Sequence, residues 1–117
     1  MNKKLMTLLA AGFTVVLMLG ACGGGGSAQA VTIKGEDIAF SPKEVTVAAG
    51  TITITFQNTG SIEHSFIIDE LGVKSEKVQP GQSSTVTFEA QPGTYTFYCD
   101  VPGHKEAGMI GTLTVTP

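Results

Sequence analysis

Four side chains that suit a soft metal ion lie in two short segments of this 117-residue chain. Cys99, His104 and Met109 follow one another with four residues between each pair, and His64 lies 35 residues before the Cys. Two imidazoles and a thiolate, with a thioether as a weak fourth donor, form a ligand set that holds copper in both oxidation states. Zn²⁺ competes for such a set, but it usually takes a fourth hard ligand or water rather than a Met.

Taken one at a time, these four residues have ordinary structural explanations. A His can be a satisfied strand residue, a Cys packs as a small apolar group, and a Met fills gaps in a core. Taken together they favour a copper site, because the sequence has only two His and only one Met after residue 18. Asp100 and Glu106 lie in the same loop, but nothing pairs them as acid–base catalysis requires, so we expect them to be solvated loop charges.

The segments that must position these side chains have the pattern of β-strands. From residue 31 onward, short stretches alternate apolar and polar residues, and none keeps a helical period. Turn signals separate the stretches, among them Ser41-Pro42, Pro92-Gly93 and Pro102-Gly103. This pattern predicts an all-β domain of two antiparallel sheets packed face to face. A closed barrel is the alternative.

The alternation also predicts where two of the donors point. In the stretch 62–69, His64 shares the even positions with apolar residues that include Ile62. In the stretch 94–99, Cys99 shares the odd positions with aromatic residues. If these two strands run antiparallel side by side, both donors meet at one end of the sandwich. The loop after the Cys then brings the other two donors to the same end.

Residues 97–115, which carry the Cys-x4-His-x4-Met spacing, resemble the copper loop of the plastocyanin/azurin-like cupredoxins, the small blue (type 1) copper proteins. The Cys-to-His spacing is similar to that of azurin and auracyanin. Residues 58–66, Asn-Thr-Gly-Ser-Ile-Glu-His-Ser-Phe, resemble the segment with the first His ligand of that family. The resemblance implies a Greek-key β-sandwich of about seven to eight strands.

The same resemblance implies roles for individual residues. The ring edge of His104 would reach the surface and pass electrons, and the backbone N–H of Ser65 would donate a hydrogen bond to the Cys99 sulfur. Small and apolar residues around His104 predict a flat patch through which a redox partner approaches; we call this set, Pro102, Gly103 and Ala107, the electron-port patch. The alternative is a loop kept small only to close over the metal.

The N-terminus reads as a targeting signal rather than as part of the fold. Residues 1–21 have two Lys near the start and an apolar run over 5–19, which is short for a membrane-spanning helix. The run ends in Leu19-Gly20-Ala21-Cys22, which resembles the lipobox of bacterial lipoproteins, in which Cys22 would be acylated. An ordinary cleaved secretory signal and an uncleaved anchor helix are the alternatives.

Residues 22–30 are rich in Gly and predict a flexible tether, so the folded domain is expected to span 31–117. A Cys22–Cys99 disulfide is the alternative to an acylated Cys22. From Cys22 onward the chain has five Lys against ten Asp and Glu, a formal net charge of −5. This charge, without any basic patch, argues against nucleic acid as a partner.

These features favour a one-electron carrier without substrate turnover, a monomer held outside the cytoplasm on a bacterial membrane, on its periplasmic or cell-surface side. Its partners would be redox proteins such as cytochromes or membrane electron-transfer complexes. An enzyme would need a second copper wired through a His beside Cys99, but Tyr98 and Asp100 are its neighbours and no further His exists. A copper-binding or copper-delivery protein is the remaining alternative, although such proteins tend to use open Met/His surfaces.

Overall fold

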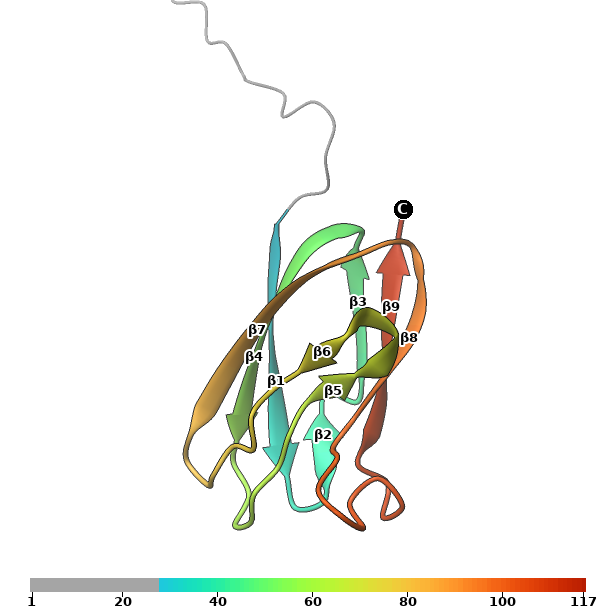
Figure 1. Ribbon diagram of the computed structural model, residues 1–117. Helices are drawn as coiled ribbons and strands as arrows, with labels where there is room; N and C mark the ends of the chain where they lie inside the picture. The colour runs from blue at the N-terminus through green and yellow to red at the C-terminus, as the bar shows by residue number, and fades with distance from the viewer. Residues whose placement is uncertain (1–27) are drawn as a thin grey trace, which may run out of the picture.

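The computed structural model describes residues 28–117, and in this part of the chain nearly all regular structure is β (Figure 1). The only helix described is the short 3-10 element η1 (Asp69–Leu71). The strands are β1 (Gln29–Glu36), β2 (Ala39–Ser41), β3 (Glu44–Ala48), β4 (Gly50–Asn58), β5 (Ile67–Ile68), β6 (Val73–Lys74), β7 (Ser83–Ala90), β8 (Gly93–Tyr98) and β9 (Ile110–Thr116).

The strands form two sheets, with the orders β2-β1-β4-β7 and β3-β9-β8-β5-β6. The chain passes from one sheet to the other several times in the Greek-key manner, so the predicted β-sandwich is confirmed. Residues 28–117 form nine strands rather than the predicted seven to eight, since three short strands of two or three residues, β2, β5 and β6, are included. The expectation of purely antiparallel sheets is wrong, because β1 with β4 and β3 with β9 pair in parallel. No tight hairpin joins either of these pairs, so nothing forces them to be antiparallel.

The core lies between the sheets and follows the predicted alternation closely. Ile52, Ile54 and Phe56 of β4 are fully buried. Phe56 also belongs to a cluster of four phenylalanine rings, with Phe40, Phe66 and Phe97, whose neighbouring centroids are 5.0–6.1 Å apart and mostly edge to face. Aromatic pairs in such arrangements contribute beyond the area they bury. This cluster supports the end of the sandwich that carries the donor residues.

The predicted strand over 62–69 is shorter than its pattern suggested. Only Ile67 and Ile68 pair as β5, and His64 makes a single isolated bridge to Val78. Because residues before β5 form a loop, strand parity does not hold there, and Ile62 is 41% exposed instead of buried.

At the other end of the sandwich, β1 begins at Gln29, two residues before the expected start of the domain. The side-chain amide of Gln29 makes two hydrogen bonds to the backbone of Ala48. Gln29 Nε2 donates to the Ala48 oxygen at 2.7 Å, and the Ala48 N–H donates to Gln29 Oε1 at 3.0 Å. The predicted signal peptide and the predicted acylation of Cys22 lie outside the described residues. Over 28–117, we find no helix with the length and apolar character that crossing a membrane requires.

Phe66→Ala tests the aromatic cluster. Phe66 is fully buried and packs against three other rings, so its removal leaves a cavity and should lower the free energy of unfolding by about 3–5 kcal/mol. Urea unfolding measures this loss. Phe88→Ala is the matched control, because Phe88 is only partly buried against the core and should cost less. Equal losses in the two variants would contradict the packing described.

Candidate metal centre

His64 is fixed in the loop between β4 and β5 by hydrogen bonds on both sides of its backbone. Its N–H donates to the Val78 oxygen at 3.1 Å, and the Val78 N–H donates to its oxygen at 2.7 Å. The buried amide of Asn58 braces the same loop, donating to the Ile62 oxygen at 2.7 Å and the Val78 oxygen at 2.8 Å. The sequence placed Asn58 at the start of the segment with the first His, and its bracing role was not predicted.

Cys99 directly follows β8, and the loop after it closes on itself. The Cys99 N–H donates to the Met109 oxygen at 3.2 Å, and the Met109 N–H donates to the His104 oxygen at 3.0 Å. Gly103 and Gly108 adopt φ values of +85° and +106°, which residues with a side chain rarely take, so they permit this compact turn. Three predicted site residues thereby come from one closed loop.

The two segments meet because β5 and β8 are antiparallel neighbours, with Ile67 opposite Tyr98. This pairing confirms the arrangement expected from the sequence. It brings the loop before β5 and the loop after β8 to the same end of the sandwich, the lower end in Figure 1.

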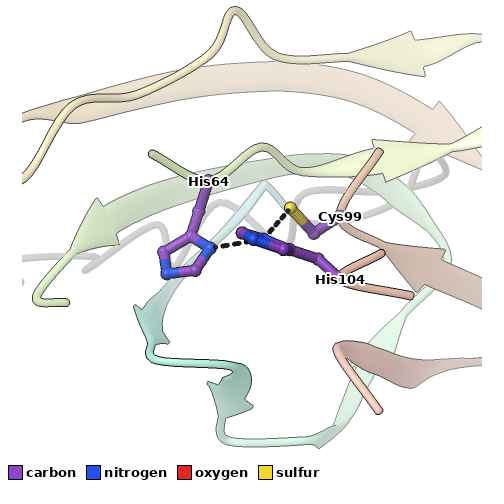
Figure 2. A group of neighbouring side chains, drawn as sticks. All are labelled: His64, Cys99 and His104. Atoms are coloured by element: carbon purple, nitrogen blue, oxygen red, sulfur yellow. Dashed lines mark hydrogen bonds between the residues drawn. The ribbon is translucent and has the colours of Figure 1, made fainter. Parts of the chain in front are cut away.

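Three donor atoms converge at this end. His64 Nδ1 lies 3.1 Å from His104 Nδ1, which lies 3.5 Å from Cys99 Sγ (Figure 2). His64 and Cys99 are fully buried and His104 is 8% exposed. With metal–ligand bonds of about 2.0–2.3 Å, donors around one ion are roughly 3–4 Å apart, so the spacing fits a single metal ion. The two nitrogens and the sulfur are donors suited to copper.

Met109 is also fully buried, and its backbone is tied to both Cys99 and His104. The structure therefore places all four predicted ligand residues at one end of the sandwich.

The Cys99 sulfur has the predicted neighbour. The Ser65 N–H donates to Cys99 Sγ at 3.3 Å, while Ser65 Oγ lies 3.7 Å from the sulfur. Ser65 Oγ also lies within hydrogen-bond distance of Asp100 Oδ1, and it accepts from the Asp100 N–H at 2.9 Å. A hydroxyl has one proton, and the nearer, charged carboxylate is its stronger acceptor. The sulfur is thus left with the backbone donor.

Asp100 is therefore not the solvated loop charge that we expected. Its side chain is 29% exposed, bonds to Ser65 and lies 3.9 Å from Lys74 Nζ. Glu106 is exposed, as expected. The spacing within the loop gave no signal for Asp100, because its partners come from segments distant in sequence.

The flank of the loop is held by Tyr98. Its hydroxyl donates to the Asp69 carboxylate at 2.9 Å, and the Lys105 ammonium lies 4.3 Å from its ring centroid. The hydrogen bond to Asp69 raises the pKa of Tyr98, because losing the proton would break that bond and place two anions together.

Asp37, in the turn between β1 and β2, is another residue whose role the sequence did not reveal. Its Oδ1 lies 3.0 Å from His64 Nε2, and the Ser61 N–H donates to its Oδ2 at 2.9 Å. The Ser61 hydroxyl donates to the same carboxylate. The hydrogen bonds from the Ser61 hydroxyl and N–H, and then that from His64, lower the pKa of Asp37 to about 2. Asp37 lies 27 residues before His64, and no motif connects the two.

The electron-port patch lies at the rim of the site. Pro102, Gly103 and Ala107 are all exposed, while His104 between them is buried except for a small part of its surface. Cys22 lies outside the described residues.

A two-sheet β-sandwich with two imidazoles and one thiol converging at one end defines a class of metal-binding domain. Residues 8–115 match the family model described as a cupredoxin-like domain. The chain belongs to the cupredoxin-like family.

Relatives agree with this assignment. The chain is 40% identical to the chloroplastic plastocyanin of Physcomitrium patens over 77% of its own length, but it spans only 60% of that protein. It is 36% identical to the plastocyanin of Rumex obtusifolius, covering 73% of this chain and 97% of the relative. Among solved structures, auracyanin A of Chloroflexus aurantiacus, described as a "blue" copper protein, superimposes with a TM-score of 0.67 at 27% identity, covering 77% of this chain and all of that one.

Proposed function

We propose that this protein is a one-electron carrier that uses a mononuclear type 1 copper site, with His64, Cys99, His104 and Met109 as ligands. The observation that carries the proposal is the convergence of two imidazole nitrogens and a thiol sulfur within 4.8 Å in a buried site. Copper bound there would alternate between Cu(I) and Cu(II), which supplies the one-electron chemistry.

The protein's own contribution is to hold the donors still. The bridge to Val78, the brace from Asn58 and the loop bonds at Met109 fix the backbone of each donor segment without the metal. A ligand set held in this way presents nearly the same geometry to both oxidation states, so little rearrangement accompanies electron transfer. The Ser65 N–H at the sulfur favours the thiolate as a ligand.

Two other functions fit the chain less well. A multicopper enzyme would need further His ligands, and the sequence has only the two already used. Copper delivery would favour donors open to an acceptor protein, whereas His64 and Cys99 are fully buried here. An electron carrier has no substrate to admit, so exposure of the edge of one ligand ring is enough for electron transfer.

The proposal includes location and partners. Cys22 would be acylated, and the residues after it would tether the domain outside a bacterial membrane, on the periplasmic or cell-surface side. The support is the Leu19-Gly20-Ala21-Cys22 sequence and the Gly-rich stretch that follows it. From there the protein, as a monomer, would exchange electrons with cytochromes or membrane electron-transfer complexes through the electron-port patch.

The first prediction concerns metal binding. The wild-type domain should bind one copper ion and be blue when oxidised, because charge transfers from the Cys99 thiolate to the metal. Cys99→Ser replaces the thiolate by a hydroxyl and should abolish the visible band, as measured by absorption spectroscopy with copper analysis. A colourless wild type with bound Cu(II), or a mutant that keeps the band, would contradict the assignment.

The second prediction concerns Met109. Met109→Gln should keep the copper but lower the reduction potential, because an amide oxygen supports Cu(II) better than a thioether does. Voltammetry measures the change. Met109→Leu is the control, since it removes the donor without adding an oxygen and should not lower the potential. If the Gln variant has an unchanged or higher potential, Met109 is not the axial ligand.

The third prediction concerns the electron-port patch. Ala107→Glu should leave colour and potential nearly unchanged but slow electron self-exchange, because two copies meeting through this face would bring added negative charges together. NMR line broadening in mixtures of oxidised and reduced protein measures the rate. Gln91→Glu adds the same charge at the opposite end of the sandwich and serves as the control. Equal rates in wild type and Ala107→Glu at low salt would mean that electrons leave by another face.

A further inference from the structure

The imidazole of His64 has two nitrogens, and only one of them faces the other donors. Nδ1 points toward His104, while Figure 2 shows the second ring nitrogen on the side away from Cys99 and His104. That second nitrogen, Nε2, lies 3.0 Å from Asp37 Oδ1. A buried ring of this kind is oriented by whatever its outer nitrogen bonds to.

The Asp37 carboxylate is held firmly for this contact. The Ser61 N–H donates to both of its oxygens, at 3.1 and 2.9 Å, and the Ser61 hydroxyl donates as well. Gly60 leaves the space for the pair: a Cβ at this position would collide with Asp37 Oδ1 and lie 3.1 Å from His64 Nε2. The turn between β1 and β2 and the His64 loop are thus shaped around the contact between Asp37 and His64.

The contact determines which nitrogen of His64 carries the proton. A carboxylate is only an acceptor, so His64 Nε2 must carry the hydrogen and donate it. The lone pair of Nδ1 is then free, and it points to the place where the three donors converge. The hydrogen bond to an anion also makes the ring a stronger electron donor toward a metal.

We propose that Asp37 is a positioning residue that, through His64, favours Cu(II) over Cu(I) and thereby lowers the reduction potential of the site. The inference rests on the proposed type 1 copper function and deepens it. Cu(II) has one more positive charge than Cu(I), so an anion bonded to a ligand ring stabilises the oxidised state more. Asp100, the other carboxylate close to the site, bonds to Ser65 rather than to a ligand ring, so it does not share this role.

Solvent does not cancel the effect of Asp37 on the reduction potential. The Asp37 side chain is 35% exposed, so water weakens its direct Coulomb interaction with the metal. The hydrogen bond remains, because it joins the carboxylate to a fully buried ring. Residues that bond to metal ligands in this way typically change metal affinity by about 10–100-fold.

Asp37→Asn is the direct test, because Asn keeps an oxygen acceptor for His64 but has no charge. The ratio of Cu(II) to Cu(I) affinity should fall about tenfold, which corresponds to a potential about 59 mV higher, and the blue colour should remain. Spectroelectrochemical titration measures this shift. Glu36→Gln, at the exposed neighbouring residue, removes the same charge without any contact to His64 and should leave the potential close to that of the wild type.

A second measurement begins with the wild-type protein, so its first readout does not depend on how the variant folds. In the reduced wild-type protein, the His64 Nε2 proton should give a slowly exchanging, downfield ¹H NMR signal, and Asp37→Asn should move it upfield. A blue wild type in which Asp37→Asn and Glu36→Gln shift the potential equally, or in which this proton is absent, would overturn the inference alone. A wild type that fails to form a blue copper site would overturn both the inference and the proposed function.

Discussion

Burying two imidazoles and a thiol in an apolar core is the constraint on which this structure depends. Polar groups removed from water cost free energy unless each is bonded. Hydrogen bonds from residues around the site offset this cost: Asp37 bonds to the outer nitrogen of His64, and the Ser65 N–H donates to the Cys99 sulfur. Within residues 28–117, every buried side-chain nitrogen and oxygen has a hydrogen-bond partner. The inward-facing atoms are thereby left to point toward one another.

The rest of the sandwich supports this arrangement. Pairing of β5 with β8 brings together two loops that are distant in sequence, and the phenylalanine cluster includes Phe66, two residues after His64. A packed core resists deformation, so the donors keep their positions when the charge at the site changes. Rigidity at the ligands and an exposed rim beside His104 are the two properties that a carrier needs. The loop after Cys99 supplies the rim and part of the rigidity, while Val78 and Asn58 hold the His64 segment.

The sequence was most informative where chemistry or periodicity is local. The Cys-x4-His-x4-Met spacing identified Cys99 and His104, two of the three residues whose donor atoms converge, and alternation along β4 identified core positions such as Ile54. It failed where contacts are long-range. The parallel pairs, the bonds of Asp37 and Asp100, and the exposure of Ile62 depend on segments that meet only in the folded chain. A single carboxylate in a turn shows no pattern that could reveal its partner.

We propose above all that His64, Cys99, His104 and Met109 hold one copper ion through repeated one-electron cycles. A spectroelectrochemical titration of the copper-loaded protein, with copper content measured before and after and an apo acceptor protein present, tests it most directly. A single reversible one-electron transition is expected, with a slope of about 59 mV per tenfold change in the oxidised-to-reduced ratio, and one copper should be retained per chain. Loss of copper to the acceptor on reduction, or the absence of a reversible transition, would show that the site does not serve as a one-electron carrier.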